Sequence, residues 1–480
     1  MEYVLVVDIG TTNLKVASYT LDGKQVTFLQ SACGQTDITL QDAPYILQTT
    51  LQLLANTVAK LTKKDATIQI KQLVFSSAMH SVLFLDENFN PLSPIYTWAN
   101  NCGQEFLATL KQLSMVQARY FKTGTPLHPM APFVKLYGFK QKQPELLQKS
   151  AYVVGIKEYL LWHLTGQLKM DLGIATATGL VIDKQWDAAL LECVGLKKTQ
   201  MPPLAVPTYQ AKITAKMAQK LGLAPTTQIV WGSSDGALAN LGVSQVDELV
   251  LTFGTSAAIR VLTKQPCYHQ NNSLFCYIAK EHQWIVGGPS NNAGNVLAWF
   301  RQTYGLEDLS FAEMLALIAE SPIGAEGLLF LPYLYGERAP LWDAQVSAQF
   351  FNVKATHTRP MLLRAVVEGL FMNFASIISL LEQQLGQNFA KIKVTGKIFQ
   401  TPCCAQMLAD ILGKQVEVLP KQEASCLGAF KLVKKQSEIS SPDLISYVPL
   451  ESAVQKYQRI FANFQVKQKF VSHGTFFKNS

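Results

Sequence analysis

A short segment near the beginning of the chain combines residue types that can hold a phosphate group. The strand-like run Tyr3–Val7 leads into Asp8, and a G-T-T-N turn at residues 10–13 follows, with Lys15 two positions later. Glycine lets backbone amides approach a phosphate, while hydroxyls and a lysine donate to its oxygens. An aspartate at a strand end can hold Mg²⁺ or its water shell. Alone, the pattern is weak, because Gly-Thr in a hairpin is most often plain turn chemistry.

The same pattern returns near the middle of the chain. The run Leu249–Phe253 reads as a strand, Gly254-Thr255-Ser256 follows, and residues 258–261 resume an apolar strand pattern. Two such hairpins facing each other across a cleft would hold successive phosphates of a nucleotide. The repetition also predicts two related lobes, with a boundary close to Gly242 and a ligand between them.

A single acid stands between the two hairpins, in the segment W-G-S-S-D-G-A-L-A-N-L-G at residues 231–242. Asp235 is flanked by small residues at the expected start of a helix, so its carboxylate can face a cleft. There it could accept a proton from a substrate hydroxyl, a role worth about 10²- to 10⁴-fold in rate. The alternative is that Asp235 simply caps the helix, which is the commoner task for an aspartate in this place.

The elements that must position these residues alternate between strands and helices. The opening predicts a β-meander, with Asp22-Gly23 as a hairpin turn. Apolar residues at helical spacing predict helices over 45–64, 360–387 and 404–412, and residues 73–75 predict another strand. In the long helix, one apolar face runs from Leu363 to Phe374. The alternation predicts the α/β class.

Length and composition limit the classes of protein that fit. A chain of 480 residues favours two domains, and 48% hydrophobic against 16% charged residues indicates a globular fold. The longest apolar stretches, such as 327–335, fall short of the roughly 18 residues that span a membrane, so we expect no membrane crossing. Asp8 interrupts the first apolar run and no basic region precedes it, which argues against a secretory signal. We therefore expect a cytoplasmic protein.

The cysteines predict no zinc site, and the charges predict no binding of nucleic acid. The eight cysteines form no CxxC pair and have no histidines at zinc-finger spacing, so free buried thiols are expected. The net charge of +8 is scattered in pairs such as Lys63-Lys64 and Lys197-Lys198. Nucleic-acid binding would call for a concentrated basic patch, and we expect no nucleic-acid partner.

Taken together, the motifs resemble the FGGY carbohydrate kinases, which belong to the actin, hexokinase and Hsp70 ATPase-fold (ribonuclease H-like) superfamily. The resemblance covers nearly the whole chain. It rests on blocks in the family's order: D-I-G-T-T-N-L-K at 8–15, S-S-A-M-H at 76–80, the Trp98 segment, residues 170–180, G-S-S-D-G-A at 232–237, F-G-T-S at 253–256, Y-G-E-R-A-P-L-W-D at 335–343, R-A-V-V-E-G at 364–369 and Q-M-L-A-D-I-L-G at 406–413. Within the family, T-G-T-P-L-H-P-M-A-P at 123–132 and T-W-A at 97–99 look most like gluconate kinases.

The resemblance implies two related lobes with a cleft between them. Residues 1–243 would form the lobe with the sugar site, the first phosphate hairpin and the catalytic aspartate. Residues 244–480 would form the lobe with the second hairpin and the adenosine region. The implied cofactors are ATP and Mg²⁺, the implied partners are ATP and a small sugar acid, and a homodimer stays open.

The family's roles carry over to matching positions. Asp235 matches the catalytic base, and Asp8 matches the residue near Mg²⁺. The phosphate-binding positions are Gly10, Thr11, Thr12, Asn13, Lys15, Gly254 and Thr255. The adenosine segment contributes Gly396, Lys397 and Gln400. The sugar-binding positions are Met79, His80, Trp98, Asn100 and Asp235.

This chain differs from the family pattern at three positions of the predicted site. Relatives show Trp-x-Asp-x-Arg where this chain has Asn100 and Cys102, so a carboxylate and a guanidinium are both absent. An amide at position 100 would hydrogen-bond a sugar acid without repelling its carboxylate, whereas the lost arginine has no such account. Relatives also carry consecutive glycines where Lys397 stands, and its side chain would either crowd the base or reach a phosphate.

Several side chains keep a structural alternative. His80 could be a satisfied core histidine, and Trp98 could be plain packing. Arg338 could pair with Glu337 or meet an anionic ligand. Spacing of i,i+4 predicts a surface or interdomain ion pair between two residues of the long helix, Arg364 and Glu368. His128, Lys157 and Arg338 are the candidates for binding a substrate carboxylate.

The leading hypothesis is an ATP- and Mg²⁺-dependent kinase of a sugar acid, with D-gluconate to 6-phosphogluconate as the first candidate and Asp235 as the base. One alternative is a kinase of a ketopentose such as xylulose, or of another polyol. The other is a degenerate member that binds a sugar or nucleotide and regulates a partner without turnover.

Overall fold

The structure is a computed structural model and describes residues 1–34, 37–268, 273–420, 423–434 and 444–473. It divides into two compact units. Unit 1 comprises Met1–Gln245, Leu262–Ile285 and Gln422–Ser441, and unit 2 comprises Val246–Val261, Val286–Lys421 and Pro442–Ser480. Two segments from the second half of the chain therefore belong to the first unit.

The core of unit 1 is a six-stranded mixed sheet. Its strands lie in the order β13 (Gln210–Lys212), β14 (Gln228–Ser234), β5 (Gln69–Ser77), β1 (Glu2–Ile9), β2 (Asn13–Thr20) and β3 (Gln25–Ala32). The predicted meander is confirmed, because β1, β2 and β3 pair antiparallel in sequence order. Strands β1, β5 and β14 run parallel, so their carboxyl ends lie at the same edge.

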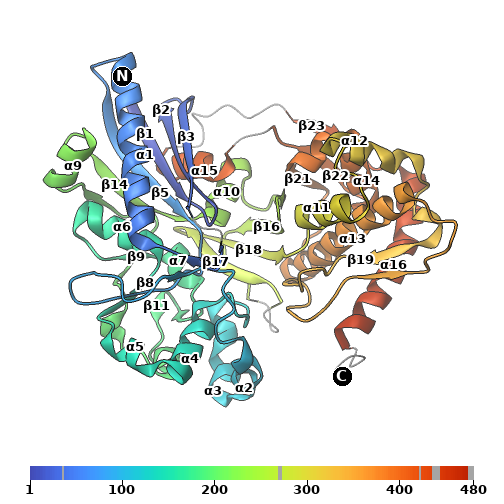
Figure 1. The fold of residues 1–480 in the computed structure, drawn as a ribbon, viewed down its shortest axis with the longest axis horizontal. Coiled ribbons are helices and arrows are strands. Elements are labelled where there is room, and N and C mark those ends of the chain that lie inside the picture. The colour runs from blue at the N-terminus through green and yellow to red at the C-terminus, as the bar shows by residue number, and fades with distance from the viewer. Residues whose placement is uncertain (35–36, 269–272, 421–422, 435–443, 474–480) are drawn as a thin grey trace. The chain divides into compact units, whose positions relative to one another are not determined.

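Helices of unit 1 pack on this sheet. The predicted helix at 45–64 is α1 (Ala43–Lys64), which begins after the cap Asp42 and packs on β2 and β3 (Figure 1). The other helices of the unit are α2 (Leu107–Gln112), α3 (Ser114–Arg119), α4 (Pro132–Lys142), α5 (Pro144–Lys149), α6 (Ile156–Thr165), α7 (Leu172–Thr176), α8 (Ala188–Cys193), α9 (Ala215–Leu221), α10 (Asp235–Val243) and α15 (Ala424–Val433).

Short strands complete unit 1. They are β4 (Leu40–Gln41) with β7 (Ile95–Tyr96), β6 (Leu83–Leu85) with β8 (Tyr152–Val154), β9 (Met170–Asp171) with β12 (Leu204–Ala205), β10 (Val181–Ile182) with β11 (Gln185–Trp186), and β17 (Phe275–Lys280).

Two glycines let α15 pack closely against α10. A Cβ atom on Gly428 would collide with the backbone carbonyl of Leu238, and one on Gly242 would collide with that of Ala424. The two helices therefore touch through their backbones. This contact brings the beginning of α15, which is far away in sequence, to the carboxyl-end edge of the sheet, where α15 contacts β1 and β5.

Unit 2 repeats the hairpin-plus-parallel-strand arrangement. Its main strands lie in the order β18 (Gln283–Ser290), β16 (Ala257–Thr263), β15 (Leu249–Phe253), β21 (Lys391–Thr395), β22 (Gln415–Val418) and β23 (Ile445–Tyr447), and β19 (Leu329–Leu331) pairs with β20 (Gln349–Phe351). The antiparallel β15–β16 hairpin and the parallel β21 correspond to β1–β2 and β5 of unit 1. The prediction of two related strand-Gly-Thr-strand halves is confirmed.

The long helix of unit 2 is α13 (Arg359–Leu385), and it is accompanied by α11 (Gly294–Thr303), α12 (Phe311–Ala316), α14 (Pro402–Leu412) and α16 (Glu451–His473). By length and composition α13 is the one helix in the described ranges that could cross a membrane, but 89% of its most apolar window is buried within the protein. It is a core helix.

The burial of α13 confirms one prediction and corrects another. The predicted apolar face from Leu363 to Phe374 is buried, and the polar residues between are buried too, because residues 363–378 are enclosed on every side. The i,i+4 ion pair between Arg364 and Glu368 is present at 2.8 Å, but its predicted surface position is wrong, because both residues are buried. The hydroxyl of Tyr457 on α16 completes this network.

All eight cysteines are free, as predicted. Only half of them are buried, however. The buried thiols are Cys33, Cys276, Cys404 and Cys426, and the other four are partly exposed.

Candidate active site

Three parallel strands of unit 1 bring the predicted catalytic segments to one edge of the sheet. Asp8 on β1 is in register with Ser76 on β5, and Ser76 is in register with Ser233 on β14. Neighbouring strands are about 4.8 Å apart, so the backbones at Asp8 and Ser233 are about 10 Å apart. Asp235 lies two residues beyond Ser233. Ligands of α/β sheets bind at such carboxyl-end edges.

Asp235 is the first residue of α10, but it is not the residue that caps it. The cap is Ser234, whose hydroxyl accepts a hydrogen bond from the backbone N–H of Ala237 at 3.3 Å. The Asp235 carboxylate accepts one from the neighbouring Gly236 N–H at 2.7 Å and is half-buried. The partial positive charge at the helix start stabilises its ionised form.

A glycine sets the direction of this strand end. Gly232 has φ 68°, and a Cβ there would collide with the carbonyl of Phe75 on β5. The pairing register of β14 with β5 shifts between Val230 and Ser233 at the same point. Only glycine allows this close approach, which determines where the chain turns into α10.

Asp8 lies almost completely buried in a small polar network. Its Oδ1 accepts a hydrogen bond from the hydroxyl of Ser76 at 2.6 Å, and its Oδ2 accepts one from the hydroxyl of Ser425 at 2.8 Å. Neither serine was assigned a role from the sequence. Ser76 stood in a recognised block, whereas Ser425 is 417 residues from Asp8 and left no local signal.

The Asp8 network fits a magnesium ion that keeps most of its water. Among the described residues no group of three His, Cys, Asp or Glu side chains could enclose a metal. Mg²⁺ is commonly held by one or two carboxylates together with waters and substrate phosphates. The Asp8 carboxylate, already fixed by two hydroxyls, suits contact with such a hydrated ion.

Lys15 is held by a second carboxylate that the sequence did not reveal. Its ammonium group lies 2.7 Å from Glu423 and 3.8 Å from Asp8. Burial alone lowers the pKa of Lys15, but the charges of Asp8 and Glu423 outweigh that effect and raise it. Lys15 is therefore a charged donor with part of its side chain still exposed.

The first Gly-Thr hairpin is closed by an internal bond and accepts hydrogen bonds from the side chains of Gln41 and Trp98. Gly10 donates its N–H to the carbonyl of Asn13 at 3.0 Å, which closes the turn. The Thr11 carbonyl accepts from the amide of Gln41 at 2.7 Å, and its hydroxyl accepts from the indole N–H of Trp98 at 2.8 Å. Thr12 and Asn13 are exposed at the tip. Trp98 is thus a neighbour of the predicted phosphate hairpin.

Three of the predicted sugar residues, Met79, His80 and Asn100, have local contacts within unit 1. His80 follows β5, is buried, and donates from Nδ1 to the carbonyl of Ala177 at 2.8 Å. Met79 is half-buried against a core cluster of unit 1. The side-chain oxygen of Asn100 accepts from the backbone N–H of Cys102 at 2.9 Å. That contact orients the amide, whose NH₂ group can donate to a hydroxyl.

In unit 2, the second hairpin and the predicted adenosine segment are neighbours. Thr252 on β15 pairs in register with Thr395 on β21, so Gly254 and Gly396 follow at adjacent strand ends. Gly396 has φ 139°, and a Cβ there would collide with the carbonyl of Phe253. Only glycine allows this close approach of the two backbone segments.

Lys397 opens a short 3₁₀ turn, Lys397–Gln400, after this glycine. Its ammonium group lies 5.4 Å from the ring centre of Phe311, a cation–π distance, and the residue is exposed. Gln400 at the end of the turn is exposed as well. The long side chain at the family's glycine position therefore packs on a neighbouring ring.

The three candidates for binding a substrate carboxylate have structural partners. Lys157 forms a fully buried ion pair with Asp171 at 2.6 Å. His128 accepts from the backbone N–H of Met130 through Nδ1. Arg338, in unit 2, donates to the carbonyl of Ser290 at 3.2 Å.

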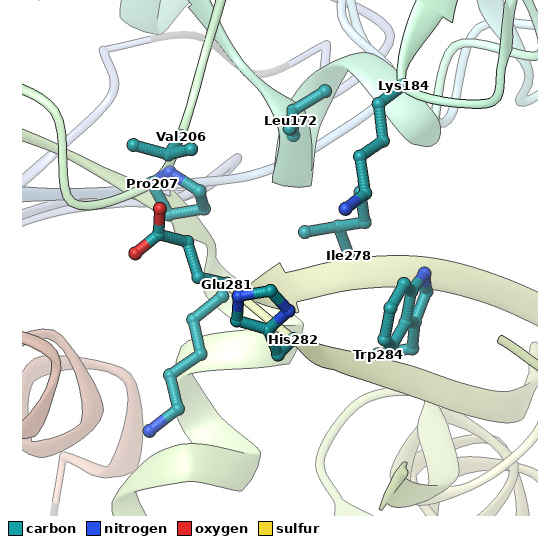
Figure 2. Close-up of a pocket in the computed structure, with 9 residues that line it drawn as sticks. Leu172, Lys184, Val206, Pro207, Ile278, Glu281, His282 and Trp284 are labelled. Atoms are coloured by element: carbon teal, nitrogen blue, oxygen red, sulfur yellow. The ribbon is translucent and has the colours of Figure 1, made fainter. Parts of the chain in front are cut away.

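A pocket of about 100 Å³ lies in unit 1. Figure 2 shows the Lys184 side chain reaching into it, with His282 and Trp284 on the opposite wall. The Lys184 ammonium lies 5.7 Å from the Trp284 ring centre. None of the residues predicted from the motifs lines this pocket.

Comparisons with known proteins agree with the motifs. Profiles of the FGGY family of carbohydrate kinases match residues 3–242 (N-terminal domain) and 249–433 (C-terminal domain). The chain is 33% identical to a gluconokinase of Bacillus subtilis, over 96% of this chain and 94% of that protein.

Two solved structures are similar over nearly their whole length. A gluconate kinase from Lactobacillus acidophilus superposes with a TM-score of 0.92 at 32% identity, over 98% of this chain and 99% of that one. A ligand-bound xylulose kinase from the same species superposes with a TM-score of 0.91 at 32% identity and the same coverage. The fold is the two-domain actin-like ATPase fold, as predicted.

Proposed function

This chain belongs to the FGGY family of carbohydrate kinases, and from that membership we propose that it is a gluconokinase that converts D-gluconate and ATP to 6-phosphogluconate and ADP. The similarity to the Bacillus subtilis gluconokinase over 96% of the chain is the observation that carries the proposal. Small soluble metabolites are its proposed substrates, and we expect it to act in the cytoplasm.

Asp235 is the proposed general base. The substrate hydroxyl oxygen attacks the γ-phosphorus of ATP, its proton passes to the Asp235 carboxylate, and the bond from phosphorus to the ADP oxygen breaks. The position of Asp235 at the start of α10 suits this role, because its side chain is only half-buried and Ser234, not Asp235, caps the helix. Base catalysis of this kind contributes about 10²- to 10⁴-fold.

The rest of the proposed machinery binds and orients phosphates. Exposed backbone and hydroxyl groups of residues 10–13 and 254–255 would donate to phosphate oxygens, and Lys15 would add a positive charge. Bound Mg²⁺ beside Asp8 would neutralise charge on the phosphates. Phosphoryl transfer depends mainly on such positioning and charge stabilisation.

The side-chain amide of Asn100 favours a substrate that carries a carboxylate group. A neutral amide replaces the family's carboxylate in the predicted sugar site, and it can hydrogen-bond a hydroxyl without repelling the carboxylate of gluconate. This residue is the sequence feature that favours a sugar acid over a neutral sugar.

Kinetic measurements on purified protein test the proposal. ATP consumption with Mg²⁺ is measured against gluconate, other aldonates, xylulose, ribulose and glycerol, with Asp235→Asn alongside. We expect the highest kcat/KM with gluconate and a fall in kcat of about 100-fold or more in the variant, with sugar binding retained. Unchanged turnover in Asp235→Asn would remove this residue from the role of base.

Xylulose is the second candidate substrate, because the xylulose kinase from Lactobacillus acidophilus is as similar in sequence as the gluconate kinase. A higher kcat/KM for xylulose than for gluconate would select it. Nucleotide binding without turnover on any sugar would favour the regulatory alternative.

A further inference from the structure

Glu337 is a completely buried carboxyl group in unit 2, in the loop between β19 and β20. Its two oxygens accept five hydrogen bonds. The donors are the backbone N–H groups of Asn291 (2.7 Å) and Arg338 (2.8 Å), the hydroxyl of Ser290 (2.8 Å) and the side-chain amides of Asn292 (3.2 Å) and Asn373 (3.0 Å). All five groups are donors, so both oxygens of Glu337 act as acceptors.

Three of the five donors belong to one segment, residues 290–292, which begins at the last residue of β18. The same segment is locked to the loop by further bonds. The Asn292 amide donates to the carbonyl of Gly336 at 2.7 Å, and its oxygen accepts from the N–H of Tyr335 at 3.2 Å. Glu337 is therefore the carboxyl group that joins this loop to residues 290–292.

The segment continues directly to the second Gly-Thr hairpin. Asn295 donates from its side chain to the Asn291 carbonyl at 2.9 Å and from its backbone to the Thr255 carbonyl at 3.1 Å. Gly294 donates its N–H to the Gly254 carbonyl at 3.0 Å, and a Cβ on Gly294 would lie 2.6 Å from that oxygen. The hairpin thus rests on the start of α11.

We propose that Glu337 is a positioning residue for the nucleotide: it holds residues 290–295 in place and, through them, the Gly254-Thr255 hairpin that binds phosphate. The inference rests on the proposed phosphate role of that hairpin. Glu337 itself does not touch the nucleotide. Its effect reaches the hairpin through two short links, the Asn291 backbone and the start of α11.

Glutamine at this position would disturb the arrangement without removing volume. One carboxylate oxygen becomes an NH₂ group, and that group then faces N–H and O–H donors that it cannot satisfy. A buried donor without a partner is costly, so residues 290–292 must move apart from the loop. The hairpin resting on them would move as well.

A second buried glutamate of the same unit provides the matched control. Glu368 accepts hydrogen bonds from Arg364 (2.8 Å), Tyr457 (2.8 Å) and the N–H of Gly324 (3.0 Å). These partners do not connect it to residues 290–295. Glu368→Gln therefore disrupts a buried carboxylate network without touching the support of the hairpin.

The test measures ADP binding by titration calorimetry and the KM values for ATP and gluconate in wild type, Glu337→Gln and Glu368→Gln, together with Tm. We expect the Kd for ADP and the KM for ATP to rise about tenfold or more in Glu337→Gln, while the KM for gluconate changes less than about twofold. Glu368→Gln should lower Tm and leave both nucleotide constants within about twofold. Equal nucleotide constants in wild type and Glu337→Gln would overturn the proposal.

Ser290→Ala is the milder variant if Glu337→Gln does not fold, because it removes only one of the five donors. A weakened affinity for ADP supports the proposal, and an unchanged affinity overturns it. Calorimetry with ADP needs no sugar. The proposed role of Glu337 is therefore tested independently of the proposed gluconokinase activity. If wild type binds ADP but phosphorylates no sugar, the proposed function fails while the role of Glu337 is still decided by the variants.

Discussion

The buried ion pair between Lys157 on α6 and Asp171 before α7 allows a quantitative prediction. The two charged groups are 2.6 Å apart, and their side chains are 1% and 0% exposed. Lys157 also donates to the carbonyl of Ser233 at 3.3 Å, two residues before Asp235. Lys157→Met removes the ammonium and leaves the Asp171 carboxylate buried without its counter-charge.

The cost follows from the burial of the pair. Removing one partner of such a pair typically costs about 3–5 kcal/mol, because the remaining charge is neither hydrated nor paired. The neighbouring Glu158 adds to this cost. Burial raises the pKa of its carboxyl group to about 7, and the positive charge of Lys157, which the substitution removes, opposes that rise. At about 2–4 °C per kcal/mol, we expect Tm to fall by roughly 6–20 °C.

A double-mutant cycle isolates the pair. Asp171→Asn keeps the oxygen that accepts from the Ile174 N–H and so retains the cap of α7. Each single variant should be strongly destabilised, whereas Lys157→Met with Asp171→Asn should lose much less than the sum, because neither charge remains. Thermal unfolding followed by circular dichroism gives the four Tm values.

Additive effects would refute the reasoning, because they would show that the two charges do not depend on each other. A selective loss of gluconate turnover relative to xylulose in Lys157→Met would refute it in another way, by showing that Lys157 binds the substrate carboxylate. We expect the ratio of the two turnovers to stay constant.

Three further predictions concern other parts of the molecule. Lys397→Gly should change the KM for ATP more than the KM for the sugar, because it alters the segment after Gly396. An unchanged KM for ATP would show that a lysine at the family's glycine position does not affect nucleotide binding. Gly428→Ala should lower stability by about 1–3 kcal/mol, because a Cβ collides with the Leu238 carbonyl and separates α15 from α10; a Tm equal to wild type would contradict the close packing. Burial raises the pKa of Glu337 from 4.5 to about 7 against the opposing effects of its hydrogen bonds and of Arg338, so the folded state binds the extra proton in that window and stability falls as pH rises through it. The Tm of Glu337→Gln relative to wild type should therefore improve between about pH 5 and pH 8, and a constant difference would contradict this.

Local sequence patterns were sufficient to predict most of the strands and helices near the candidate site. The meander, the strand Leu249–Phe253 and the start of α10 at Asp235 follow from apolar periodicity and turn residues, which act over a few positions. The motifs also placed Asp8 and Gly254 at the strand ends where the structure has them. The catalytic and binding roles of these residues stay predictions.

The long helix shows where periodicity reaches its limit. Its existence follows from the apolar spacing, but the same spacing predicts one buried face. Burial of Arg364, Glu368 and Asn373 depends on partners supplied by other elements. A polar residue looks the same in sequence whether it faces water or a buried partner, so only the folded surroundings decide.

By itself, the sequence determined the order of strands and helices, the two Gly-Thr hairpins and the family to which they belong, because each depends on residues close together in the chain. Tertiary structure alone decided which polar groups support them. Ser425 reaches Asp8 across 417 positions, Glu423 reaches Lys15 across 408, and Glu337 reaches Asn291 across 46. Such contacts leave no periodic trace, because they arise only when packed elements bring distant backbone segments within hydrogen-bonding distance.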